Sequence, residues 1–315
     1  MAPEAIGHSA RLAEELDFGE LWFSEDCFFA GGMSGVTAAL GATVDLPVGL
    51  GIVSALTRHP ALLAMEIATM SRLHPGRLRP GVGLGVPVWL EQMGLMPESP
   101  LTALRECMTN LRALLAGEEV TFRGKVFSFH KIFLTHQPQE ELPLYMGLVN
   151  RKGLVLSGEI ADGTVLSVLA GTAYIRWARE QIAGGAAAAG RTGHHRIATY
   201  ALYSVDADSK KAKEALRSVT AFYLEAMPKN ALSQVYGIAD EAGEMLSRGG
   251  AAAVAREMPA QWLEDLVIAG DPDECADKIN AFLEAGSDSV NLWVFPLESA
   301  EDVLRLTARE VLPRI

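Results

Sequence analysis

Two adjacent carboxylates follow an apolar stretch near the start of the chain, in the sequence LWFSEDCFF. Glu25 and Asp26 lie at the end of a predicted strand over residues 20–25. Neighbouring side chains on an extended chain point in opposite directions, so at most one of the two faces a site. A carboxyl group buried there would have a raised pKa and could donate or accept a proton. The alternative is that both lie in a solvated loop or cap the next helix.

Three glycines alternate in the sequence RPGVGLGVPVWLEQMGL, at Gly81, Gly83 and Gly85. This spacing alone is weak evidence for nucleotide binding. The dinucleotide fingerprint needs a helix to open at the last glycine, whereas Pro87 and Trp89 intervene here. We expect the glycines to leave open space for a flat ring across the strand ends, with Leu84 between them. A plain glycine-rich turn is the competing interpretation.

The sequence LYMGLVNRKGLVLSGEIADG predicts an anion site where a strand meets a helix. The strand ends in three small or apolar residues, Gly147, Leu148 and Val149. Asn150 can cap the helix that follows, and Arg151 and Lys152 lie in its first turn. Cations at a helix N-terminus oppose the macrodipole, so they indicate a bound phosphate, which would take the free N–H groups and both side chains. The alternative is two solvated basic residues.

Strand and helix patterns alternate along the chain, which predicts a parallel sheet. We expect seven strands, near residues 20, 48, 78, 143, 163, 196 and 289. Polar or glycine-bearing segments recur at the strand ends, including Ser54 and Ser167. Such a pattern is typical of a (β/α)8 TIM barrel, whose site is built from loops at one face. An open doubly wound sheet with one switch-point crevice is the alternative.

The (β/α)8 barrel needs an eighth strand, yet the chain opens on a predicted helix. We therefore expect a TIM barrel with insertions whose first β-strand is missing, through a truncated start. The whole chain, 1–315, is interpreted as one domain. Its insertions are a hairpin at about 119–135 and a mostly helical segment at about 208–286.

The composition of the chain argues against several functional classes. Hydrophobic residues make up 49% of the chain and charged residues 21%, so a large core is expected. The net charge of -12 disfavours nucleic-acid and anionic-membrane partners. The three cysteines, Cys27, Cys107 and Cys275, are far apart, which argues against a disulfide scaffold and fits a cytoplasmic protein. No span of membrane length and no signal-peptide apolar region is visible.

The sequence lacks the motifs of metal-dependent and serine-hydrolase catalysis. There is no HxH, HExxH or other ligand spacing, so no metal site is expected. There is no GxSxG nucleophile either. His194 and His195 are expected to be exposed in a polar loop, and His59 to be structural. The methionines Met93, Met96 and Met108 are expected to lie in the core or to fill gaps in it.

With these segments in order, the chain resembles the bacterial luciferase-like monooxygenase superfamily, in particular its coenzyme F420-dependent, methylenetetrahydromethanopterin reductase-like branch. The resemblance covers essentially the whole chain. Its most specific blocks are TRHPALLAMEIATM followed by GR, and SGEIADG. Further blocks are LAEELDFGELWFSEDCFF, GVGLGVPVWLEQMGL and DPDECADKINAFLEAGSDSVNLWVFP.

The resemblance implies an oxidoreductase that transfers a hydride between the deazaflavin of F420 and a small organic substrate. It implies a non-proline cis peptide at Gly51-Ile52, in a bulge that would support the cofactor ring together with Val53. The phosphate would bind at Asn150 to Lys152. Asp26 would be the acid or base, with Glu25 second.

Two positions depart from the family. A carboxylate stands where better-known deazaflavin dehydrogenases have a histidine, and Val86 falls where the sugar-phosphate branch has a glutamate, so that branch's substrate does not transfer. The alternatives are an FMN-dependent luciferase-like monooxygenase served by a flavin reductase, and a non-catalytic flavin-binding protein. A homodimer is expected, as in much of the family.

Overall fold

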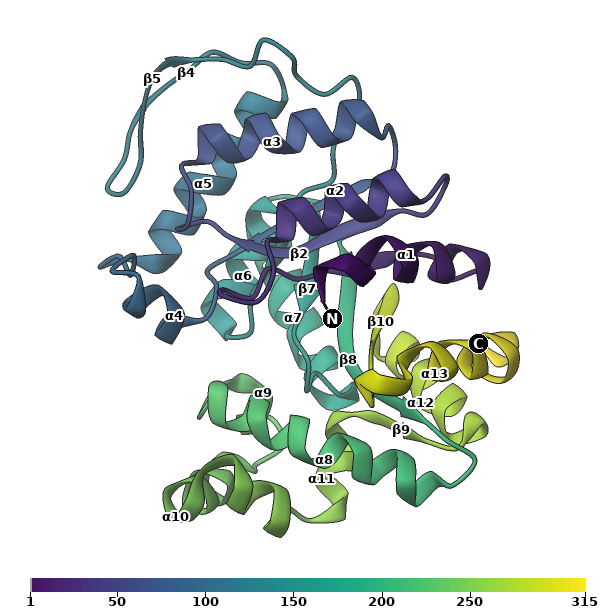
Figure 1. Cartoon of the computed structure of the whole chain (residues 1–315). Helices are drawn as coiled ribbons and strands as arrows, with labels where there is room; N and C mark the ends of the chain where they lie inside the picture. Colours follow the sequence, from purple (N-terminus) through teal and green to yellow (C-terminus); the bar gives the residue numbers. More distant parts are fainter. Residues whose placement is uncertain (1) are drawn as a thin grey trace. The chain divides into compact units, whose positions relative to one another are not determined.

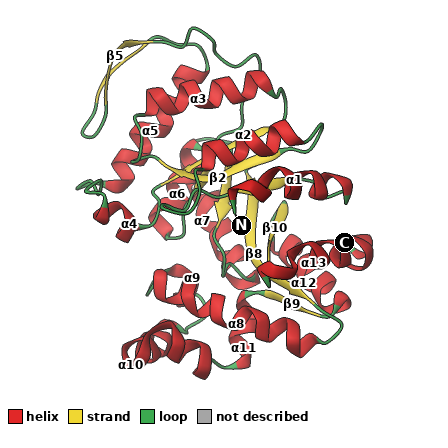
Figure 2. Ribbon diagram, in the orientation of Figure 1, coloured by secondary structure: helices red, strands yellow, loops and turns green. Residues whose placement is uncertain are grey.

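The computed structural model describes residues 2–315. The chain divides into two compact units, which are described separately. Unit 1 comprises Met1–Leu148, Leu156–Val165 and Gly185–His195. Unit 2 comprises Val149–Val155, Leu166–Gly184 and Arg196–Ile315. Figure 1 labels the helices and strands, and Figure 2 colours them by type.

Unit 1 alternates strands with helices. Its elements are α1 (Ile6–Glu15), β1 (Leu21–Phe23), α2 (Gly32–Ala42), β2 (Val48–Ser54), α3 (Pro60–Leu73), β3 (Leu78–Gly83), α4 (Pro87–Gln92), α5 (Pro100–Leu115), β4 (Val120–Arg123), β5 (Ser128–Ile132) and β6 (Tyr145–Gly147), after a 3-10 turn at Pro3–Ala5. Three elements have residues in both units, namely α6 (Arg151–Ile160), β7 (Gly163–Leu166) and α7 (Thr172–Ala188).

The sheet of unit 1 is parallel, because each strand pairs in the same direction with the next. Strand β1 pairs with β2, β2 with β3, β3 with β6, and β6 with β7. Strands β2 and β3 are buried along most of their length, and Leu50, Val53 and Val82 are fully enclosed in the core of this unit. Buried parallel strands need apolar residues on both faces, which explains their near-continuous apolar sequences.

Helix α3 begins where the sequence predicts. Pro60 occupies its first position, and the His59 side chain accepts a hydrogen bond from the Ala61 N–H group at 3.2 Å. The Nε2 atom of His59 lies 3.2 Å from the Ser128 carbonyl oxygen, and its ring packs against Phe127 and Phe129. His59 is therefore a structural residue, as expected.

Unit 2 combines a smaller parallel sheet with most of the long helices. Its elements are β8 (Arg196–Val205), α8 (Ser209–Ala226), α9 (Ala231–Gln234), α10 (Ala239–Glu257), α11 (Ala260–Leu266), β9 (Ile268–Gly270), α12 (Pro272–Ala285), β10 (Ser289–Val294) and α13 (Ala300–Leu306), followed by short turns to the C-terminus. Strand β8 pairs in parallel with both β10 and β9.

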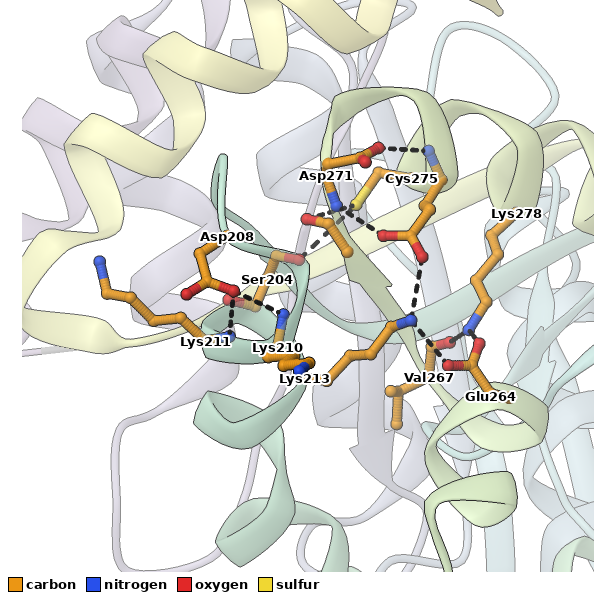
Figure 3. A network of polar contacts seen from close by, with 12 residues as sticks. Ser204, Asp208, Lys210, Lys211, Lys213, Glu264, Val267, Asp271, Cys275 and Lys278 are labelled. Atoms are coloured by element: carbon orange, nitrogen blue, oxygen red, sulfur yellow. Dashed lines mark hydrogen bonds and ion pairs between the residues drawn. The ribbon is translucent and has the colours of Figure 1, made fainter.

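A network of charged side chains joins three helices of unit 2 (Figure 3). Lys213 of α8 lies 2.8 Å from Glu264 of α11 and 3.0 Å from Glu274 of α12. Lys278 of α12 lies 2.9 Å from Glu264 and donates to the Val267 carbonyl at 3.2 Å. Asp271 and Glu274 also form a reciprocal capping box at the start of α12. The helices around β9 are thus held together by shared charges.

Most of the predicted elements are confirmed. All seven expected strands are present, as β1, β2, β3, β6, β7, β8 and β10, and β4 and β5 form the expected antiparallel hairpin. The helical segment at 208–286 contains an unpredicted strand, β9. Within residues 2–315 no strand precedes α1, and no helix there is long and apolar enough to cross a membrane. The single-domain assignment stays a prediction.

Candidate active site

Strand β2 is irregular at its centre. The peptide bond between Gly51 and Ile52 is cis. The pairing of β2 with β3 shifts register between Leu50 and Val53, so the strand bulges there. The cis bond and the bulge expected in this stretch are both confirmed. The contact of this bulge with a cofactor ring stays a prediction.

The Ile52 side chain fills the space that three glycines leave on neighbouring strands. A Cβ atom added to Gly83 would lie 2.7 Å from the Gly147 carbonyl oxygen and 2.7 Å from Ile52 Cδ1. One added to Gly147 would lie 2.7 Å from Ile52 Cγ2, and one added to Gly81 would lie 2.4 Å from the Leu50 carbonyl oxygen. The glycines accommodate Ile52 and the adjacent backbone. The expectation of open space beside Gly81 and Gly83 is therefore wrong.

Ser54 ties the ends of β2 and β3 together. Its hydroxyl donates to the Leu84 carbonyl at 2.7 Å and accepts from the Leu56 N–H group at 3.1 Å. Gly85 has a φ of 85°, and a Cβ atom there would lie 3.2 Å from Ser54 Cβ. Glycine suits this position because the backbone is left-handed and another strand end lies close by.

Glu25 is held by three hydrogen bonds at the end of β1. Its two carboxylate oxygens accept from the Arg58 guanidinium group at 3.0 and 3.1 Å. The Gly32 N–H group also donates to Glu25, at 2.9 Å. The side chains of Glu25 and Arg58 are only 10% and 24% exposed. A carboxylate so engaged orients neighbouring groups.

Asp26 has the more suitable environment for moving a proton. It is half-buried, and this burial raises its pKa, while a hydrogen bond from the Ser24 side chain acts in the opposite direction. Burial also raises the pKa of the adjacent Cys27 thiol, and the charges of Glu25 and Asp26 add to that increase. A carboxyl group that holds its proton more tightly than usual is suited to general acid catalysis.

The predicted anion-binding residues lie in unit 2, where Val149 accepts a hydrogen bond from the Tyr174 hydroxyl at 2.7 Å. The Asn150 side chain accepts from the Ala231 N–H group at 3.1 Å, and its carbonyl accepts from the first-turn N–H groups of α6. Arg151 and Lys152 are exposed in the first turn. Ser167, also in unit 2, is half-buried just after β7, and Leu148 is buried in unit 1.

Two expectations about other residues, the exposure of His195 and the burial of Met93 and Met96, need correction. His195 is half-buried, and its Nε2 atom lies 2.8 Å from the Thr164 hydroxyl, so only His194 is exposed as expected. Met108 is buried in the core as expected, whereas Met93 and Met96 are 36% and 41% exposed and do not fill it. Within residues 2–315 no group of three or more His, Cys, Asp or Glu side chains could hold a metal ion.

Arg58 is the site residue that sequence reasoning missed. Sequence reasoning places Arg58 at the start of α3, and no motif or local spacing connects it with Glu25, 33 residues earlier. A usable signal was available, because Arg58 follows the strand next to the one that Glu25 follows. The carboxyl ends of adjacent parallel strands meet at one edge of a sheet.

Parallel strands with intervening helices, a bulge in one of these strands and polar residues at the strand ends are typical of the TIM-barrel class of α/β proteins. A family model described as luciferase-like monooxygenase matches residues 1–289. The chain therefore belongs to the luciferase-like monooxygenase family, and its fold is the (β/α)8 TIM barrel with insertions found there.

Particular relatives extend this result. The chain is 30% identical to 5,10-methylenetetrahydromethanopterin reductase of Methanolobus tindarius, over 98% of this chain and 95% of that protein. It is 27% identical to F420-dependent glucose-6-phosphate dehydrogenase of Microbacterium testaceum, over 96% of this chain and 91% of that one.

Solved structures show the same similarity. Coenzyme F420-dependent tetrahydromethanopterin reductase from Methanopyrus kandleri superposes with a TM-score of 0.87 at 28% identity, covering 99% of this chain and 96% of that one. An F420-dependent secondary alcohol dehydrogenase, in complex with an F420-acetone adduct, superposes with a TM-score of 0.80 at 25% identity, covering 100% and 95%.

Proposed function

We propose that this chain is a coenzyme F420-dependent oxidoreductase that transfers a hydride between the deazaflavin and a small organic substrate. The observation that carries the proposal is the bulge of β2 between Leu50 and Val53, at the position implied by the resemblance to F420-dependent enzymes. The similarity to an F420-dependent glucose-6-phosphate dehydrogenase and to the structure of a coenzyme F420-dependent tetrahydromethanopterin reductase supports the same cofactor.

The residues of unit 1 fit a flat ring. Ile52 is half-exposed, and its side chain lies against Gly83 and Gly147, which have no side chains of their own. A ring resting on the β2 bulge would contact a surface made of backbone and one aliphatic side chain. Gly51, Val53, Ser54, Leu84 and Gly85 would complete this support.

Two basic residues of unit 2 are suited to bind the phosphate of the cofactor. Arg151 and Lys152 are exposed cations in the first turn of the ten-residue helix α6. Cations there oppose the helix macrodipole unless an anion is bound. They would hold the cofactor phosphate, together with Val149, Asn150 and Ser167 of the same unit.

When bound, the deazaflavin supplies the hydride chemistry, and the protein supplies position and protons. The Asp26 carboxyl group would give a proton to the substrate or take one from it. The two hydrogen bonds from Arg58 would hold the adjacent Glu25 side chain in place. This division leaves Asp26 as the acid or base and makes Glu25 a positioning residue.

Titration of the purified protein with F420 and, separately, with FMN tests the proposal. We expect micromolar or tighter F420 binding, and roughly 10-fold weaker binding for the double variant Arg151→Gln/Lys152→Gln, which loses two charge-assisted contacts. Arg248→Gln, on an exposed part of α10, is the matched control and should bind as the wild type does. Tight FMN binding without F420 binding would instead establish the monooxygenase alternative, with a flavin reductase as partner.

We further propose a cytoplasmic homodimer. Three free cysteines fit a reducing compartment. Leu62, Met65 and Leu73 are all more than half exposed on α3, which supports a protein partner at that face. Sedimentation of the purified protein would test the dimer.

A further inference from the structure

Large apolar side chains are exposed where β1 and β3 end. Phe28 and Phe29, just after β1, are 70% and 75% exposed, and Val88 of α4 is 51% exposed. The rings of Phe29 and Trp89 lie 6.2 Å apart, so the loop after β1 and helix α4 meet. We call these four residues the apolar mouth surface. Exposed apolar surface of this kind marks a site for a ligand or a partner.

The backbone of Phe28 is unfavourable for a phenylalanine. The Phe29 N–H group donates to the Asp26 carbonyl at 3.1 Å and closes a four-residue turn, in which Phe28 is third and has a φ of 73°. Glycine and asparagine usually occupy a third position with positive φ, since a bulky side chain is strained there. Phe28 is strained and gains little from burial, so its side chain does not serve folding. Strain retained in this way indicates a role in binding.

The charges nearby restrict the ligand. Asp26 and Glu91 are the charged residues in segments 26–34 and 84–97, and both are acidic. Arg58, whose charge also acts on Cys27 of this loop, is bound by both carboxylate oxygens of Glu25. No lysine or arginine in these segments could bind a phosphate, so an anionic ligand would be repelled. An uncharged apolar molecule is not repelled by the acidic side chains, and it packs against the aromatic rings.

We propose that the apolar mouth surface binds the apolar body of an uncharged substrate, such as a ring-containing ketone or alcohol. This inference rests on the proposed function, because the surface begins two residues after Asp26, the acid or base assigned there. The turn that holds Phe28 also contains Asp26, so one short segment supplies the proton-transfer group and the apolar contact.

Binding of 1-acetonaphthone, an uncharged aromatic ketone, to the full chain without cofactor tests the proposal. Phe28→Gly/Phe29→Ser should weaken binding at least about 10-fold, as expected for the loss of two large apolar contacts. The melting temperature should stay the same or rise, because glycine tolerates the positive φ of residue 28. Phe133→Ser is the matched control, since Phe133 is 60% exposed after β5 and should not affect binding. 1-Naphthoate, which carries a carboxylate on the same ring system, should bind at least about 10-fold more weakly than the ketone.

Equal affinity of the double variant and the wild type for 1-acetonaphthone would overturn the proposal. So would binding of 1-naphthoate as tight as that of the ketone. A change from dimer to monomer in Phe28→Gly/Phe29→Ser would also overturn it, by assigning the surface to a contact between copies. F420 affinity is measured separately, so a wild type that binds the ketone but not F420 contradicts the proposed function and leaves the apolar surface established.

Discussion

Arg58 binds both carboxylate oxygens of Glu25, at 3.0 and 3.1 Å, across the ends of two adjacent strands. Both side chains are largely shielded from water. The pair fixes the direction of the segment after β1, in which Asp26 follows immediately.

We expect Arg58→Met to lower the free energy of unfolding by about 2 kcal/mol, because it leaves the Glu25 charge shielded with one backbone donor. Urea denaturation measures this loss. Arg305→Met, which removes an exposed ion pair with Glu301, should cost less than about 0.5 kcal/mol. Equal losses in the two variants would mean that the Glu25–Arg58 pair is no more than a surface contact.

An alanine at either Gly147 or Gly83 would meet the Ile52 side chain. We expect Ile52→Ala to restore stability to only one of these two alanine variants. Gly147→Ala should cost about 1–3 kcal/mol by overpacking against the Ile52 side chain, and adding Ile52→Ala should recover much of that loss. Gly83→Ala should not be rescued in this way, because its new methyl group also meets the Gly147 carbonyl oxygen. A double-mutant cycle from chemical denaturation gives both coupling energies.

Gly41→Ala is the control for this cycle. Gly41 lies on the exposed side of α2 with no atom within 4 Å of an added Cβ. Alanine should stabilise the helix there by about 0.5–1 kcal/mol. If Ile52→Ala rescued Gly83→Ala as fully as Gly147→Ala, the assigned contacts would be incorrect.

The raised pKa of Asp26 predicts a pH dependence of stability. Burial makes the folded state bind this proton more tightly than the unfolded state does. The stabilising contribution is thus fully present below the unfolded pKa, about 3.9, and is lost as the pH rises through the folded pKa. As the pH rises through the folded pKa, the free energy of unfolding of Asp26→Asn should increase relative to that of the wild type. Urea denaturation at each pH measures this difference.

Ser24→Ala provides an independent check on Asp26. The Ser24 hydroxyl hydrogen bond lowers the Asp26 pKa, so its removal should raise that pKa further. The carboxyl carbon resonance of Asp26, followed by NMR, reports the titration directly. An Asp26 pKa below the ordinary value in the wild type would contradict the assignment of this residue as the proton donor.

The lowered pKa of Glu274 predicts the opposite pH dependence of stability. A hydrogen bond from Ser209, together with the Asp271 N–H group and Lys213, lowers the Glu274 pKa to about 2. Its contribution is therefore present above the unfolded pKa and is lost as the pH falls toward about 2. Glu274→Gln should show a smaller fall in melting temperature between pH 5 and 2, roughly, than the wild type. Identical acid profiles would show that water screens this network fully.

The sequence was sufficient for features set by local pattern. Alternating apolar segments located β1, β2, β3 and the hairpin, and the resemblance to F420-dependent enzymes located the bulge at Gly51-Ile52. It could not reveal β9, whose three residues are too short to show a period between two helices. Nor could it show that Ile52 fills the space beside Gly83, because that contact depends on the register of separate strands. The strain at Phe28 is likewise a property of backbone angles, which residue type does not disclose.

His59 has a consequence for the hairpin formed by β4 and β5. Its Nδ1 atom accepts the Ala61 N–H, so in the neutral ring the proton lies on Nε2 and is donated to Ser128. One imidazole tautomer thus serves two segments that are 69 residues apart in the sequence. Arg58 directly precedes this ring, so shortening or cleaving the hairpin would disturb the anchor of Glu25. The insertion thereby supports the edge of the sheet at which Glu25 and Asp26 lie.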